Sequence, residues 1–92
     1  IVLPGAMVRH VTFGVGQVVG LMASFPGCQA KTMELPYLKG LPDEVSMAPN
    51  GNTLHHNRFG EGKVFAYIIV FNSVIMPISY PSSFLNKELL VE

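Results

Sequence analysis

The chain has 92 residues, which is enough for one small domain or two very small ones. Hydrophobic residues make up 49% and charged residues only 13%, and six basic residues balance six acidic ones. The charged share is about half the roughly 25% of an ordinary soluble domain. The balance argues against a dedicated nucleic-acid binder, which carries a basic stripe, and the weakly charged surface favours self-association or docking on a larger partner.

The cysteine content and the hydropathy pattern limit where the chain can work. The single cysteine, Cys28, excludes an internal disulfide and suits a reducing compartment, so we expect a cytoplasmic protein. The longest apolar stretch covers residues 64–78 and is shorter than the roughly 20 residues that a membrane-spanning helix needs. We therefore expect no membrane span, and no signal peptide is visible.

In chain order, the first half predicts three strands, over residues 7–12, 17–25 and 30–35. The third of them ends at a proline, Pro36, which cannot donate to a sheet ladder. Residues 36–52, between the two copies, contain three prolines, two glycines and two asparagines, and the composition of their tail, residues 48–52, predicts a linker or loop.

The second half predicts strands over residues 53–58, 63–71 and 74–80, the last ending at Pro81. Strict alternation divides the middle strand into two apolar faces. One face carries Phe65, Tyr67, Ile69 and Phe71, and the other carries Val64, Ala66, Ile68 and Val70. Such a strand is buried on both sides or covered by a partner.

A short C-terminal helix is expected after Pro81, with Ser82 or Ser83 as its cap. Its apolar side would consist of Phe84, Leu85, Leu89 and Leu90.

An internal repeat dominates the sequence. The pattern apolar-x-H-x-x-F-G-x-G-x-V occurs at residues 8–18 and again at residues 54–64, a constant offset of 46 residues. With the same offset Phe25 falls on Phe71. We interpret the chain as a tandem duplication, with residues 1–47 and 48–92 as its two repeats.

The glycines of this pattern first suggest a nucleotide-binding loop. A strand rather than a helix follows them in both copies, and the third glycine, Gly20, becomes Ala66 in the second. A two-residue Gly-X hairpin turn at Gly14-Val15 and at Gly60-Glu61 explains the pattern better. The glycines assigned to these structural turns are Gly14, Gly16, Gly60 and Gly62.

The motif resembles the small Tudor-like (SH3-like) β-barrel at the C-terminus of bacterial superfamily 1 helicases of the UvrD/PcrA type, and related small stand-alone bacterial proteins. The segment Tyr80-Pro81-Ser82-Ser83-Phe84 is similar to the Tyr-Pro-x-x-Phe ending of those modules. The resemblance implies an all-β fold of two SH3/Tudor-like barrel repeats. It also implies an interaction module of the transcription or DNA-repair machinery, with RNA polymerase or a helicase as candidate partners.

One departure from that family concerns the barrel itself. Family members place a hairpin between the strand after the glycines and the strand that ends in Phe, whereas residues 18–25 and 64–71 run straight through. One repeat alone then closes a five-stranded barrel poorly. Two alternatives remain: the two repeats share one barrel, or strands are exchanged between chains.

The two histidines of the motif have two candidate roles, a polar contact at a binding face or a half-buried imidazole that hydrogen-bonds the backbone near the hairpin. We favour the second for both, and likewise favour core packing over base stacking for the motif phenylalanines. If the motif does bind a partner, its candidate binding residues are Arg9, His10, Phe13, His56, Arg58, Phe59, Tyr67 and Tyr80.

No catalytic, metal or cofactor site is expected. His55 and His56 are neighbours on a strand and point to opposite faces, so they cannot chelate a metal with Cys28. Asp43 and Glu44 lack a placeable partner, and no G-x-S-x-G elbow is present. We expect a non-catalytic module that docks on a protein. Weak, salt-dependent nucleic-acid binding and a self-assembling homo-oligomer are the alternatives.

Overall fold

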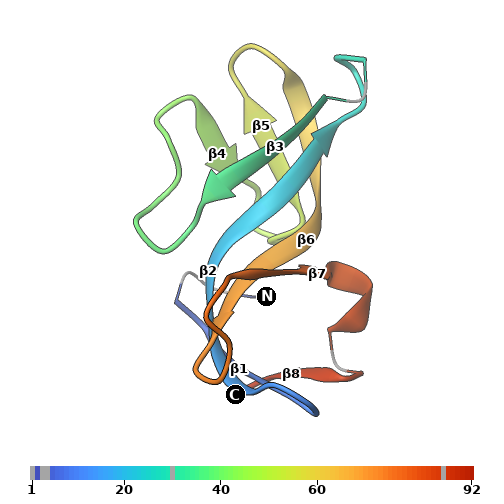
Figure 1. Cartoon of the computed structure of the whole chain (residues 1–92). Helices are drawn as coiled ribbons and strands as arrows, with labels where there is room; N and C mark the ends of the chain where they lie inside the picture. The colour runs from blue at the N-terminus through green and yellow to red at the C-terminus, as the bar shows by residue number, and fades with distance from the viewer. Residues whose placement is uncertain (1, 3–4, 30, 86) are drawn as a thin grey trace.

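The computed structural model describes Val2 and residues 5–29, 31–85 and 87–92. These residues form eight strands in one curled sheet and a single turn of 3-10 helix (Figure 1). The elements are β1 (Met7–His10), β2 (Gly14–Phe25), β3 (Lys31–Pro36), β4 (Val45–Met47), β5 (Thr53–His56), β6 (Gly60–Phe71), β7 (Ile78–Pro81), η1 (Ser82–Phe84) and β8 (Leu89–Val91). The expected all-β class is confirmed.

Two long antiparallel strands, β2 and β6, form the centre of the sheet, in the order β4-β5-β6-β2-β1-β8. Each changes its outer neighbour midway. Strand β2 pairs first with β1 and then with β3, while β6 pairs first with β5 and then with β7. The molecule thus has two lobes, at the bottom and top of Figure 1.

We define lobe 1 as β1, β7, η1 and β8 together with the first half of β2 and the second half of β6. Lobe 2 consists of β3, β4 and β5 with the other two half-strands. Each lobe therefore contains backbone from both halves of the sequence. Residues 18–25 and 64–71 run straight through because β2 and β6 each continue from one lobe into the other.

A β-bulge interrupts each long strand. Along β2 the partner residues pass from Val18↔Ile69 to Gly20↔Ile68, so Val19 is the extra residue. Along β6 the extra residue is Phe65, which lies between the pairs Met22↔Ala66 and Ala23↔Val64. The two bulges are 46 residues apart, at equivalent positions of the repeat pattern.

The bulge overturns the predicted faces of residues 64–71. Tyr67, Ile69 and Phe71 are 4%, 0% and 1% exposed, whereas Phe65 is 41% exposed and does not share their face. An extra residue reverses the in–out alternation, so Val64 and not Phe65 packs against the core. The prediction of strict alternation is wrong, because it assigns every second residue to one face along the whole strand and the bulge at Phe65 interrupts that pattern.

The hairpin turns differ in detail from the prediction. His10 pairs with Gly14 and His56 with Gly60, so three residues form each turn, at 11–13 and 57–59. Gly14 and Gly60 have positive φ values of 76° and 79°, as the turn geometry requires. The two-residue Gly-X turn is therefore wrong in length, and Val15 and Glu61 belong to strands.

The second glycine of each motif is not a turn residue either. Gly16 and Gly62 are buried within β2 and β6. A Cβ atom on Gly16 would lie 2.6 Å from Cδ1 of Phe71, and one on Gly62 would lie 2.7 Å from Cδ1 of Phe25. Glycine is needed there because an aromatic ring packs directly on the backbone.

The chain after Pro81 contains no α-helix in its described part. Only the turn η1 is helical, and no side chain caps it. The chain then forms β8, which pairs with β1 and leaves Leu89 only 1% exposed. The predicted helix is wrong because β1 needs a neighbour on its open side. The predicted loop over residues 48–52 is confirmed, since these residues join β4 to β5. The strand β4 itself, which pairs with β5, is not predicted by the sequence.

The core is continuous across both lobes. Its fully buried large side chains include Val8, Val18, Leu21, Phe25, Leu35, Leu54, Ile69, Phe71 and Leu89. Among the described residues, no helix has the length and apolar character required to cross a membrane.

Candidate binding surfaces

His10 lies in an aromatic cluster in lobe 1. Its Nδ1 accepts hydrogen bonds from the backbone N–H groups of Thr12 and Phe13, at 2.9 and 3.1 Å, and its Nε2 is hydrogen-bonded to the Tyr80 hydroxyl. The imidazole stacks on Phe13 at 4.7 Å between ring centroids and meets the edge of Phe71 at 5.9 Å. Both ring nitrogens are engaged, and the side chain is 6% exposed.

His56 repeats this arrangement in lobe 2. Its Nδ1 accepts from the N–H groups of Arg58 and Phe59 at 2.9 and 3.2 Å. The ring stacks on Phe59 at 4.3 Å and contacts Phe25 at 5.8 Å. The position of Tyr80 is taken by Leu35, which offers no hydroxyl. Both histidines therefore hold their hairpin turns, the structural role favoured above.

Each cluster draws its buried phenylalanine from the other half of the sequence. His10 contacts Phe71 rather than Phe25, and His56 contacts Phe25 rather than Phe71. This crossing follows from the shared strands β2 and β6. Phe13 and Phe59 are partly buried and pack against the core.

Two cations lie over Phe59 in lobe 2. The Lys31 Nζ is 4.9 Å from the ring centroid, and the Arg58 guanidinium carbon is 5.9 Å from it. His56 stacks on the same ring, so Phe59 contacts both an imidazole and the cations. The position of Arg58 in lobe 1 is occupied by Thr12, which is uncharged.

The tyrosines belong to the interior. Tyr67 and Tyr80 are 4% and 7% exposed, and Tyr37 donates a hydrogen bond to the carbonyl of Val2. Burial raises the pKa of Tyr67, and burial together with the nearby Glu88 raises the pKa of Tyr80. Neither phenol is presented to a partner.

Of the remaining candidates, Arg9 is exposed and forms an ion pair with Glu92, with 2.8 Å between Nε and Oε1. The eight candidates thus do not form one site. The motif residues lie at two separate hairpins, β1–β2 in lobe 1 and β5–β6 in lobe 2, at opposite ends of the molecule (Figure 1).

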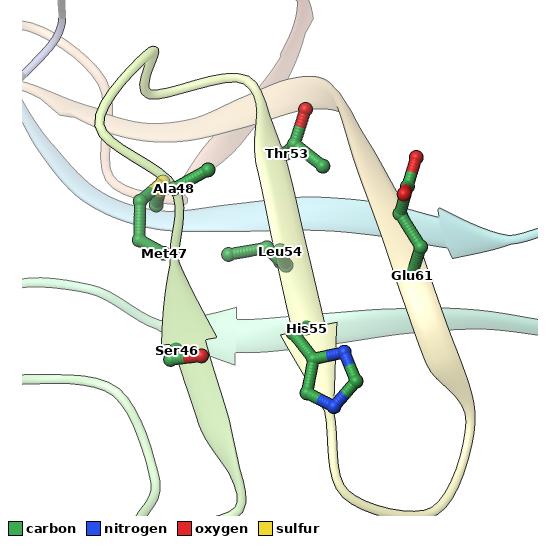
Figure 2. Close-up of a pocket in the computed structure, with 7 residues that line it drawn as sticks. All are labelled: Ser46, Met47, Ala48, Thr53, Leu54, His55 and Glu61. Atoms are coloured by element: carbon green, nitrogen blue, oxygen red, sulfur yellow. The ribbon is translucent and has the colours of Figure 1, made fainter.

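The outer face of lobe 2 carries polar side chains from three adjacent strands. Ser46, His55 and Glu61 lie side by side in one cross-strand row, because Ser46 pairs with His55 and His55 with Glu61. A hollow of about 190 Å³ lies here, and Figure 2 shows the residues that line it. They are Ser46, Met47, Ala48, Thr53, Leu54, His55 and Glu61.

Sequence reasoning missed this face. From the sequence, His55 suggests only a metal ligand, and no strand is predicted at Ser46. The available signal was Glu61 in the position that Val15 occupies in the first copy, since a change to a charged residue at an equivalent strand position marks a different surface.

The described residues contain no group of three or more His, Cys, Asp or Glu side chains that could hold a metal ion. Comparison with known proteins found no matching family model, no matching curated protein and no matching solved structure.

Proposed function

We propose that the protein is a non-catalytic interaction module that docks on another protein through the outer face of lobe 2. The hollow beside Ser46, His55 and Glu61 is the observation that carries this proposal. These side chains offer a hydroxyl, an imidazole and a carboxylate, and all three are exposed.

The size of the hollow favours a protein partner over a small molecule. Its volume of about 190 Å³ is below the roughly 300–1,000 Å³ of pockets that bind small molecules and cofactors. It is of the right order for one side chain of a partner protein. Met47 and Leu54 add apolar contact, and the polar row would fix the orientation of that side chain.

The proposed architecture is a tandem pair of SH3/Tudor-like repeats that exchange half-strands within one chain. The repeated motif, the equivalent hairpins and the equivalent bulges support it. The resemblance to helicase-associated modules adds the partner class, a cytoplasmic protein of transcription or DNA repair such as RNA polymerase or a helicase.

A capture experiment with purified, tagged protein tests the docking face. Glu61→Val and Ser46→Leu place on lobe 2 the residues that lobe 1 has at these positions, Val15 and Leu90, so the fold should accept them. We expect each to reduce partner recovery about tenfold or more relative to the parent chain. The control Gln17→Lys, on lobe 1, should leave recovery unchanged. Failure to recover any protein reproducibly, or equal recovery by Glu61→Val, would refute the proposal.

A second candidate function is nucleic-acid binding at the turn of lobe 2. The cations Lys31 and Arg58 over Phe59 favour it, since phosphates attract such groups. Binding to a single-stranded oligonucleotide should then weaken steeply with added salt, and Arg58→Thr, which introduces the residue at the equivalent position in lobe 1, should flatten that dependence. No binding at low salt would eliminate this candidate.

A further inference from the structure

The outer face of lobe 1 is apolar, in contrast to that of lobe 2. Strand pairing places six outward residues in two cross-strand rows. The rows are Leu90–Arg9–Val15 and Met7–Gln17–Val70. Met7, Val70 and Leu90 are 39%, 37% and 48% exposed. The only charge of the face, on Arg9, is paired with Glu92 of the same molecule.

The equivalent face of lobe 2 serves as an internal comparison. Its rows are Ser46–His55–Glu61 and Thr53–Lys63–Ser24, from the same pairing of equivalent strands. Every one of these six residues is polar or charged. The fold therefore accepts polar residues at all six positions, and the apolar side chains of lobe 1 are not required by the packing of the sheet.

The whole surface shows the same division. Ten large apolar side chains are exposed among the described residues, and eight of them lie in lobe 1 or in the turns that join its strands. Three of the eight, Met7, Val70 and Leu90, lie in the two outward rows, and the others are Val11, Ile75, Met76, Phe84 and Val91. Only four charged residues, Arg9, Lys87, Glu88 and Glu92, lie in this part of the chain, and the other eight, four basic and four acidic, lie elsewhere. Such concentration of exposed apolar surface marks an interaction site.

We propose that this face binds a second copy of the chain, so that two lobe 1 sheets pack face to face in a symmetric dimer. In a two-fold contact the same patch meets itself, so a charged face repels its copy while a neutral apolar face is self-complementary. The face of lobe 1 meets this condition, because its one charged residue, Arg9, is neutralised by Glu92 of the same molecule.

The dimer would cover only part of the surface of each chain. A stable interface buries about 800 Å² on each partner, roughly one-seventh of the 5586 Å² surface of the chain. Facing sheets pack about 10 Å apart. In this dimer the apolar faces of lobe 1 are covered, and the charged lobe 2 of each copy remains in water at the two ends. The hollow of lobe 2 stays open, so dimer formation and partner docking are independent.

Sedimentation equilibrium of the purified full chain over a range of concentrations tests the proposal. We expect a monomer–dimer equilibrium with a dissociation constant in the micromolar range or tighter. Met7→Thr and Val70→Ser introduce the residues that lobe 2 has at these positions, Thr53 and Ser24. Each should raise the dissociation constant about tenfold or more.

Phe65→Ser is the matched control, because it removes an apolar side chain that is 41% exposed but lies in the lobe 2 half of β6. It should leave the dissociation constant unchanged, and circular dichroism should show that all variants are folded. A strict monomer at the highest soluble concentration overturns the proposal. So does a dimer that Met7→Thr and Val70→Ser leave intact. Loss of a captured foreign protein from these variants, with a monomeric parent chain, would assign the face to that protein instead.

Discussion

At the scale of single residues, two glycines set how closely the two halves of the chain can approach. The ring of Phe71 packs against the backbone of Gly16, and the ring of Phe25 packs against the backbone of Gly62. In both cases the ring comes from the other half of the sequence. By contrast, a Cβ atom on Gly27 would meet nothing within 4 Å. Gly16 and Gly62 are therefore required by close packing, whereas Gly27 is not.

Gly16→Ala should lower the free energy of unfolding by about 1–3 kcal/mol, because the added methyl group collides with a buried ring that has no room to shift. Gly27→Ala, where space is open and φ is not positive, should change it by less than about 0.5 kcal/mol. Urea denaturation of the two variants measures the difference. Equal effects would contradict the assigned ring contact.

The hydrogen bonds of the two histidines define their tautomer. Because Nδ1 of His10 and of His56 accepts two backbone N–H groups, the ring proton must be on Nε2. Nitrogen-15 chemical shifts should show the Nε2–H form for both at neutral pH. The chemical shifts of His55, whose side chain is exposed, provide the internal reference. A protonated Nδ1 on His10 or His56 would show that the turns are held in another way.

The buried tyrosines predict alkaline sensitivity. Burial raises the pKa of Tyr67 above its ordinary value of 10.0, so the fold favours the neutral phenol. Its stabilising contribution is complete below pH 10 and is lost as the pH rises through the raised pKa. The free energy of unfolding, measured by urea denaturation, should fall above about pH 10. Tyr67→Phe should show a smaller fall, and an identical pH dependence would contradict the buried state.

At the scale of elements, β8 supplies the outer neighbour of β1 and places Leu89 in the core. Leu89→Ala should therefore destabilise the protein by about 2–5 kcal/mol. Leu38→Ala removes the same atoms at a position that is 46% exposed and should cost well under half as much. Thermal or urea unfolding compares the two. Similar small effects would mean that β8 does not seal lobe 1.

The accuracy of the sequence predictions also differs by element. Residues 63–71 were identifiable as strand because β-branched and aromatic side chains are dense there. The bulge at Phe65 was not, since no local residue marks the point where alternation reverses. Leu85 and Leu89 have a spacing that suits a helix, and only the unpaired edge of β1, a tertiary feature, selects a strand. The three residues of β4 are too few to give a pattern.

At the scale of the whole molecule, β2 and β6 belong to both lobes, so neither lobe can lose its structure alone. Leu54→Ala, in the core of lobe 2, should lower the stability of lobe 1 by the same amount. Hydrogen exchange of amides in β1 and in β5 would then report equal global free energies. Separate, unequal values for the two strands would indicate independently folding barrels.

The motif occurs twice in the sequence, but the sequence leaves open how its two copies pack. Phe25 and Phe71 occupy equivalent positions in the pattern, so the sequence allows either ring to pack against His10 or His56. Sequence alone therefore cannot distinguish a repeat that packs on itself from one that packs on its neighbour. The two outer surfaces could not be predicted from the sequence either. Val70 and Ser24 are equivalent positions, but only the strand pairing shows that both lie on outer faces.

The exchange of half-strands between the two lobes is the central claim, and aromatic nuclear Overhauser effects test it most directly. The structure predicts contacts of the His10 ring with Phe71 and of the His56 ring with Phe25, at centroid distances of 5.9 and 5.8 Å. Two self-contained repeats would instead place His10 against Phe25 and His56 against Phe71. Observation of that second pattern would contradict the fold described for both lobes.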